Sequence, residues 1–162
     1  MDAIVLPGVG NFKEAMKNLK ALKQNILVAA ESGVPLLGIC LGMQLFFEES
    51  EESLGRGLGI LRGKVLKLPE QVKKPHMGWN TLAISKPNEI LDGVGDDEYF
   101  YFVHSYYADP SMKEVIVAET EYGIRFASVL AENNVYGVQF HPEKSGRSGE
   151  RVIRNFASIV KR

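Results

Sequence analysis

The chain has 162 residues, of which 45% are hydrophobic, and this length favours one domain over residues 1–162 with a substantial buried core. Nineteen basic and twenty acidic residues leave a formal net charge of −1. Proteins that bind nucleic-acid phosphates typically carry a basic excess, so we do not expect nucleic-acid binding. The single cysteine cannot form an internal disulfide, and the N-terminus lacks the basic start and long apolar stretch of a secretory signal. We therefore expect a soluble, cytoplasmic protein.

The first part of the chain alternates between apolar strands and amphipathic helices. Apolar runs over residues 2–6 and 35–39 each end in a turn or glycine and predict two buried strands. Between them, hydrophobic residues recur every three or four positions, which predicts one helix over residues 11–33, capped by Asn11. A second helix is expected over residues 41–49. Strand, helix, strand and helix at this spacing predict an α/β fold with parallel strands.

The rest of the chain is predicted to form short strands followed by one helix. An acidic cluster at residues 48–52, interpreted as a solvated face, leads into a glycine-rich loop at 54–59. Asn133-Asn134 predicts a hairpin turn because asparagine tolerates a positive φ, and Ser148 is expected to cap the last helix. The expected strands cover residues 64–68, 81–85, 99–107, 115–120, 126–132 and 135–141.

Cys40 lies between a short apolar strand and a helix, with Gly38 and Gly42 two residues to either side. This spacing is the G-x-S-x-G pattern of a nucleophile elbow, with cysteine in place of serine. Such a turn strains the backbone and leaves no room for neighbouring side chains, and the helix N-terminus favours the thiolate. The pattern predicts a catalytic nucleophile. The alternative is a buried cysteine that acts as a small hydrophobic residue.

His141 and Glu143 follow the last predicted strand and are candidates for a general base and its carboxylate partner. Residues two apart in an extended chain face the same way, and a neighbouring carboxylate fixes the tautomer of an imidazole. A solvated polar pair is the alternative. Backbone N–H groups of Leu41 and of the loop at residues 7–10 are candidate oxyanion donors, although the loop also fits a plain glycine turn. With scattered histidines and one cysteine, no metal or cofactor is expected.

Two segments, Gly38–Gln44 and His141–Glu143, resemble the class I, triad-type glutamine amidotransferases. Further segments are similar to one branch of that family, whose members supply ammonia to a (β/α)-barrel cyclase subunit in histidine biosynthesis. These segments are residues 6–12, 75–80, 101–106 and 141–145. The resemblance covers the whole chain, and five motifs in the same order make it specific. It implies a flavodoxin-like α/β fold with a mixed central sheet flanked by helices.

The resemblance also implies a role for each matched residue. Cys40 would attack the glutamine side-chain amide to form a γ-glutamyl thioester and release ammonia, with His141 as base and then acid, oriented by Glu143. The implied oxyanion donors are the backbones of Gly8, Val9 and Leu41. The implied substrate-holding residues are Gln44, His104, Ser105 and Tyr106. Residues at the interface with the cyclase and the ammonia exit would be Trp79, Asn80, Tyr101 and Lys144, and the two subunits would form a heterodimer.

One departure concerns the N-terminus, because family members usually carry a further strand and helix with a Gly-x-Gly-Asn turn before the segment that opens this chain. We therefore expect an N-terminally shortened sheet, with an unpaired edge beside the catalytic strands unless something else covers it. Two other functions stay open. One is the glutaminase of anthranilate or aminodeoxychorismate synthase, which shares the elbow and the His-x-Glu pair. The other is a non-catalytic interaction subunit, against which the intact Cys40, His141 and Glu143 argue.

Overall fold

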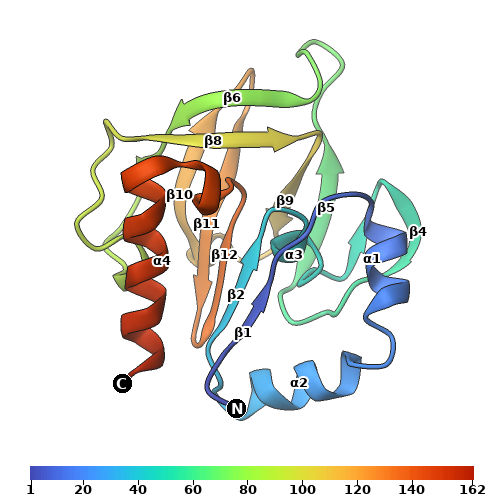
Figure 1. Ribbon diagram of the computed structural model, residues 1–162. Coiled ribbons are helices and arrows are strands. Elements are labelled where there is room, and N and C mark those ends of the chain that lie inside the picture. Colours follow the sequence, from blue (N-terminus) through green and yellow to red (C-terminus); the bar gives the residue numbers. More distant parts are fainter.

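A computed structural model describes residues 1–162 and shows a central six-stranded sheet with helices on both faces (Figure 1). The strand order is β1-β2-β12-β11-β10-β7. Its strands are β1 (Ile4–Leu6), β2 (Leu36–Ile39), β7 (Ala83–Ile84), β10 (Ile116–Glu121), β11 (Arg125–Glu132) and β12 (Val135–Val138). β1, β2 and β12 run parallel, whereas β11, β10 and β7 are joined to them in antiparallel fashion. The mixed sheet expected from the sequence is therefore confirmed.

Two smaller sheets lie beside the central one. One has the order β4-β3-β5-β9, and the other is the antiparallel pair β6-β8, which Figure 1 shows crossing the upper end of the central sheet. The strands are β3 (Glu49–Ser50), β4 (Ser53–Arg56), β5 (Gly63–Lys67), β6 (His76–Thr81), β8 (Tyr99–His104) and β9 (Tyr106–Pro110). Short 3₁₀ helices cover Glu89–Leu91, Lys113–Val115 and Pro142–Lys144.

Four helices enclose two hydrophobic cores, one on each face of the central sheet. The helices are α1 (Phe12–Asn18), α2 (Lys23–Glu31), α3 (Leu41–Gln44) and α4 (Gly146–Val160). On one face, α4 packs against the sheet together with β8; on the other, α1, α2 and α3 do so with β5 and β9. Strand β11 serves both cores, since Phe126 and Val129 join the first while Ala127 and Leu130 join the second. Burial on both faces explains why the strand shows no polar alternation.

The helix expected over residues 11–33 is two helices, because the chain turns at residues 19–22 between α1 and α2. The hydrophobic repeat continues through that turn, so the periodicity alone does not reveal it. The N-terminal cap is confirmed, since the Asn11 side chain accepts a hydrogen bond of 2.8 Å from the Glu14 N–H. The helix expected over 41–49 ends at Gln44, after little more than one turn.

The other strands expected after residue 50 are present, although those expected at residues 81–85 and 135–141 are shorter. The expected strand at residues 99–107 bends at Ser105 into β8 and β9. Strands β3, β4 and β6 were not expected, and β4 occupies part of the loop expected at residues 54–59. Asn133 has the predicted positive φ, 53°, in the hairpin between β11 and β12. Ser148 does not cap α4, which begins at Gly146; its hydroxyl instead donates a hydrogen bond to Glu98.

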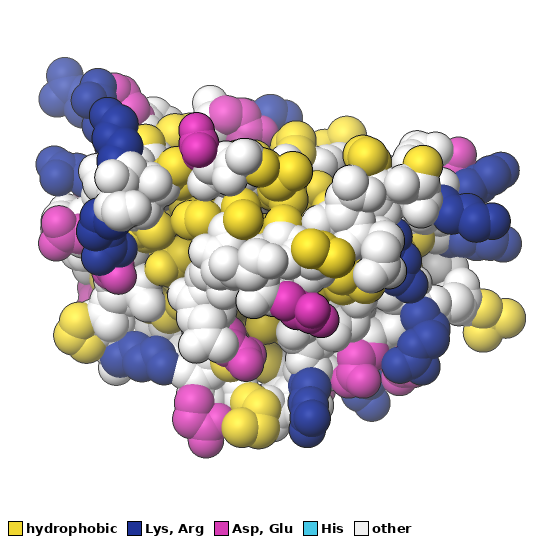
Figure 2. All heavy atoms as spheres, turned by 90° about the horizontal axis from the view of Figure 1, so that it is seen from below, with side chains coloured by type: hydrophobic (Ala, Val, Ile, Leu, Met, Phe, Trp, Pro, Cys, Tyr) yellow, Lys and Arg dark blue, Asp and Glu magenta, His cyan; other side chains and the backbone are white.

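Strand β1 forms one edge of the central sheet, because it pairs with β2 and with nothing on its other side. Its neighbour β2 is the strand that precedes Cys40. Val5 in β1 is exposed, and the view from the side of α2 and the chain ends shows hydrophobic side chains across the middle of the surface (Figure 2). None of the four helices combines the length and apolar character needed to cross a membrane.

Candidate active site

Cys40 follows the fully buried strand β2 and precedes α3, so it lies at the carboxyl end of the parallel strands. Its backbone has φ 54° and ψ −111°, a conformation that L residues rarely adopt. This sharp reversal is the predicted nucleophile elbow. Ligands of α/β sheets bind at this end of the strands, which makes the position suitable for a reactive group.

The two flanking glycines are required by close packing around the elbow. A Cβ at Gly42 would lie 1.7 Å from the carbonyl oxygen of Leu6 in β1. A Cβ at Gly38 would lie 2.7 Å from the backbone nitrogen of Met43 and 2.6 Å from the Phe46 ring. The prediction that side chains beside the nucleophile would clash is therefore confirmed.

The Cys40 thiol is protonated in this arrangement. Its sulfur donates a hydrogen bond to the Val103 carbonyl at 3.7 Å and accepts one from Nε2 of Gln139 at 3.4 Å. Burial raises the pKa of the thiol to about 11, against smaller lowering effects of the Leu41 N–H and the Gln139 amide. The N-terminus of α3 favours the thiolate as expected, because the Leu41 N–H lowers the pKa, but desolvation by burial is the larger effect.

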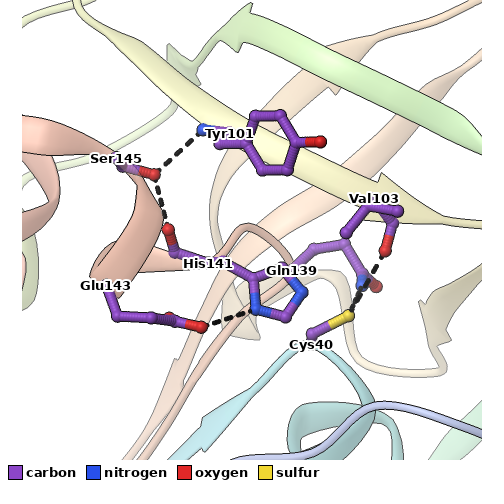
Figure 3. Close-up of polar contacts among 7 residues, drawn as sticks. All are labelled: Cys40, Tyr101, Val103, Gln139, His141, Glu143 and Ser145. Atoms are coloured by element: carbon purple, nitrogen blue, oxygen red, sulfur yellow. Dashed lines mark hydrogen bonds and ion pairs between the residues drawn. The ribbon is translucent and has the colours of Figure 1, made fainter.

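His141 has the orientation of a general base for this thiol. Its Nδ1 lies 2.9 Å from Oε2 of Glu143, so Nδ1 carries the proton and Nε2 keeps a free lone pair. Nε2 is buried without a hydrogen-bond partner, and Figure 3 shows it on the side of the ring that faces Cys40. The predicted pairing is confirmed, although the 3₁₀ turn Pro142–Lys144, rather than an extended chain, brings Glu143 to the imidazole.

The backbone of His141 is fixed to strand β8 through Ser145. The Ser145 hydroxyl donates to the His141 carbonyl at 2.6 Å and accepts from the Tyr101 N–H at 2.9 Å (Figure 3). The His141 N–H donates in turn to the Tyr101 carbonyl at 2.9 Å. Three hydrogen bonds therefore hold the imidazole in place relative to β8.

A cleft of about 210 Å³ opens beside Cys40. All four predicted substrate-holding residues line it, although Gln44 and His104 are themselves buried. The lining residues are Val9, Gly10, Cys40, Leu41, Gln44, Glu52, Val103, His104, Ser105 and Tyr106. Both ring nitrogens of His104 bond within the protein, to the Tyr106 carbonyl and to His76, so they are unavailable to a ligand.

Of the predicted oxyanion donors, the loop after β1 keeps free N–H groups. Gly8, Val9 and Gly10 donate no backbone hydrogen bond, and Gly10 has φ 105°. Val9 and Gly10 line the cleft, whereas Gly8 packs against the Leu41 side chain. The Leu41 N–H acts on the Cys40 sulfur and lowers its pKa.

The predicted interface residues separate into two groups. Trp79 and Tyr101 lie opposite each other on β6 and β8, with ring centroids 5.8 Å apart in an edge-to-face arrangement. Lys144 is exposed beyond His141. The Asn80 side chain instead donates to the Glu121 carbonyl at 3.0 Å and contacts His76, on the opposite face of β6 from Trp79.

Sequence reasoning missed three residues of this site. Gln139 and Ser145 are buried polar residues that contact Cys40 and His141, and a glutamine inside the apolar run before His141 was the available signal. Glu52 belongs to the acidic cluster interpreted as a solvated face. Its carboxylate accepts a hydrogen bond of 2.8 Å from the Phe12 N–H and lines the cleft, so that interpretation is wrong for Glu52.

Comparison with known proteins gives the same assignment. Residues 1–160 match the family Glutamine amidotransferase class-I. The imidazole glycerol phosphate synthase subunit HisH of Methanocaldococcus jannaschii is 51% identical over 160 residues, covering 98% of this chain and 81% of that protein. The subunit of the same name from Pyrococcus furiosus is 50% identical, with 98% and 82% covered. The chain thus spans about four fifths of the length of these relatives.

Solved structures support the fold independently. A glutamine amidotransferase crystal structure aligns with a TM-score of 0.74 at 19% identity, covering all of this chain and 80% of that one. A glutamine amidotransferase from Thermotoga maritima aligns with a TM-score of 0.64 at 20% identity, with 98% and 63% covered. At such identities the likeness concerns the fold alone. The family match and the relatives with half of their residues in common show that this chain belongs to the class-I glutamine amidotransferases.

Proposed function

We propose that the chain is the glutaminase subunit of an imidazole glycerol phosphate synthase and acts in histidine biosynthesis. The observation that carries the proposal is the arrangement of the Cys40 thiol, the free Nε2 of His141 and the Glu143 carboxylate beside one cleft. Relatives about 50% identical over nearly the whole chain carry that name and support the choice among triad amidotransferases.

The reaction begins with proton transfer from Cys40 to Nε2 of His141, and the Glu143 carboxylate stabilises the resulting imidazolium. The thiolate attacks the side-chain carbonyl carbon of glutamine, whose oxygen takes up the negative charge. N–H groups of the loop at Gly8 and Val9 are the proposed donors to that oxygen, together with Leu41. His141 then protonates the leaving nitrogen, so that ammonia departs and a γ-glutamyl thioester remains. Water, deprotonated by His141, attacks the thioester, the C–S bond breaks and glutamate is released. The proton on His141 then returns to the Cys40 sulfur and regenerates the thiol.

Residues of the cleft suit the rest of the substrate. Glutamine carries an ammonium and a carboxylate at the end away from its reacting amide. The Glu52 carboxylate is the acidic side chain lining the cleft, and we assign it to the substrate ammonium. We assign the backbone and hydroxyl groups of Ser105 and Tyr106 to holding glutamine, and Gln44 to shaping the cleft.

The partner surface is the outer face of the β6–β8 pair. Met77, Trp79 and Tyr99 are 62%, 55% and 58% exposed there, a group of large apolar side chains that a partner would cover. Tyr101 and the exposed cation of Lys144 adjoin it. We propose that a (β/α)-barrel cyclase subunit binds this face as a cytoplasmic heterodimer and receives the ammonia.

Replacement of the nucleophile tests the proposal. Cys40→Ala should abolish glutamine hydrolysis in the complex with the cyclase, because no thioester forms, while the complex keeps its turnover with free ammonia. The assay measures glutamate release and imidazole glycerol phosphate formation, with and without the cyclase. Loss of both activities, or of neither, would contradict the assignment. A non-catalytic subunit would release no glutamate in either form, and an anthranilate or aminodeoxychorismate glutaminase would not be stimulated by this cyclase.

A further inference from the structure

A line of buried polar groups joins strand β6 to the active site. His76 of β6 and His104 of β8 are directly opposite in the strand register, and both are buried. Nδ1 of His76 lies 3.0 Å from Nε2 of His104. Aromatic rings surround the pair, since Phe102 and Tyr122 stack on His76 with centroids 4.9 and 4.0 Å away. Each of these buried imidazoles needs a hydrogen-bond partner for both ring nitrogens, because buried polar atoms in folded proteins are hydrogen-bonded.

The partners of this pair allow only one assignment of hydrogens. A carbonyl can only accept, so the hydrogen bond of 2.9 Å between His104 Nδ1 and the Tyr106 carbonyl places a hydrogen on Nδ1. Neutral His104 then has a lone pair on Nε2, which accepts from Nδ1–H of His76. The lone pair on Nε2 of His76 is left to accept from the Asn80 amide at 3.3 Å. Donation runs in one direction, from Asn80 to the Tyr106 carbonyl.

Burial keeps both imidazoles neutral, as this assignment requires. Desolvation lowers the pKa of His76 to about 4 and that of His104 to about 3. Asn80 is itself held by its bond to the Glu121 carbonyl, so the first donor of the line is oriented.

The same carbonyl continues the line to the nucleophile. Nε2 of Gln44 donates to the Tyr106 carbonyl at 2.9 Å and to Oε1 of Gln139 at 3.1 Å. Because Oε1 of Gln139 is occupied in this way, its amide turns Nε2 toward the Cys40 sulfur at 3.4 Å. A flipped Gln139 amide would instead present an oxygen to the sulfur, which would oppose the thiolate.

We propose that His76 and His104, locked as Nδ1–H tautomers, are positioning residues that orient Gln44 and Gln139 and so keep a hydrogen-bond donor on the Cys40 sulfur. Neither imidazole exchanges a proton during turnover. The catalytic consequence rests on the proposed function, whereas the tautomer assignment does not.

The hydrogen-bonded line from Asn80 through His76, His104 and Gln44 to Gln139, which we call the relay, lies directly beneath the outer face of β6. His76 lies on the inner face of β6, and Met77 and Trp79, its exposed neighbours on that strand, lie on the outer face. Any partner that covers the outer face therefore contacts the strand that carries the first two donors of the relay. Displacement of β6 by a few tenths of an ångström changes the His76–His104 distance directly.

Nitrogen NMR of the imidazole rings tests the tautomers in the whole 162-residue chain. We expect protonated Nδ1 and unprotonated Nε2 for both His76 and His104, unchanged between pH 7 and pH 5. An Nε2–H tautomer at either residue, or an imidazolium at pH 6, would overturn the proposal whatever the chain's activity is.

Substitutions test the positioning role. His76→Leu removes the donor to His104, and His76→Asn places an amide donor near the lost Nδ1. In the complex with the cyclase, His76→Leu should lower kcat for glutamine about 10-fold, the loss typical of one buried hydrogen bond. It should also raise the apparent pKa for alkylation of Cys40 by iodoacetamide, while His76→Asn restores most of both values. Turnover with free ammonia should not change in either variant.

Phe126→Leu is the matched control, because Phe126 is equally buried and packs against both imidazoles at 5.8 and 4.9 Å without a hydrogen bond. It should lower the melting temperature as the His76 variants do and leave the alkylation profile unchanged. Equal effects of Phe126→Leu and His76→Leu on the apparent pKa for alkylation of Cys40 would show that His76 acts only through packing, which would contradict the proposal. Failure of His76→Asn to recover activity would likewise contradict the relay. Absence of glutaminase activity in the unaltered complex would instead count against the proposed function and leave the alkylation and NMR results decisive.

Discussion

Glu143→Gln removes one negative charge beside the catalytic imidazole and keeps the size of the side chain. The Glu143 carboxylate lies 2.9 Å from His141 Nδ1, and a glutamine carbonyl can still accept that hydrogen bond. The hydrogen bond that orients the imidazole is therefore kept. The imidazolium that forms when Cys40 gives up its proton loses its counter-charge.

The magnitude follows from Coulomb's law and the exposure of the pair. Unit charges about 4 Å apart interact by about 1 kcal/mol in water and about 4 kcal/mol at an effective dielectric constant near 20. The Glu143 side chain is 52% exposed and that of His141 3%, so the interaction lies between these limits. We expect a loss of about 1.4 to 2.7 kcal/mol, which lowers kcat by about 10- to 100-fold. KM for glutamine should change little, because the charge exists only after proton transfer.

Steady-state glutamate release in the complex with the cyclase measures this effect. Glu150→Gln is the control, since Glu150 forms an exposed ion pair with Arg154 on α4 and should leave kcat unchanged. The reasoning is refuted if Glu143→Gln keeps full kcat or raises only KM. A loss as complete as that of Cys40→Ala would mean that the carboxylate does more than stabilise charge.

Three further predictions follow from the site. Gly42→Ala should lower the melting temperature and reduce kcat by about 100-fold or more, because its Cβ would lie 1.7 Å from the Leu6 carbonyl and displaces the elbow; a fully active variant would refute the packing. Glu52→Gln should raise KM for glutamine several-fold with a smaller change in kcat, and an unchanged KM would remove Glu52 from the substrate site. The folded-state pKa values of His76 and His104, about 4 and 3, lie below the unfolded value of 6.5. The free energy of unfolding should therefore be highest above pH 6.5 and fall as the pH drops toward 4. Urea unfolding measures this free energy, and equal values at pH 7 and pH 5 would contradict the prediction.

Local patterns predicted the reactive part of the site well. Gly38 and Gly42 around a lone cysteine indicate the elbow, because a sharp strand-to-helix turn leaves no room for a Cβ at either position. His141 and Glu143 are two residues apart, so their pairing depends on local chain geometry alone. Local patterns could not predict the relay, because His76 and His104 are 28 residues apart and meet only through the register of β6 and β8.

Secondary structure was predicted where a stretch buries a regular pattern and was missed where tertiary contacts decide. Strands β2 and β11 are apolar runs, and both were found. The turn between α1 and α2 was not predicted, because the hydrophobic repeat runs through it. Strand β6 was not predicted, because its residues alternate between buried polar and exposed apolar side chains, the reverse of the usual pattern. That inversion follows from the position of the strand, since the polar side chains of His76 and Asn80 contact the interior and the apolar side chains of Met77 and Trp79 are exposed.

The outer edge of β1 has a consequence for work with the 162-residue chain. A strand with unpaired N–H and C=O groups can recruit a second such strand, and Val5 adds an apolar side chain to that edge. Pairing of two chains grows with the square of concentration. The dimeric fraction of the 162-residue chain should therefore rise as the chain is concentrated and fall on dilution, which size-exclusion chromatography measures. A lysine at the exposed Val5 position should flatten that dependence.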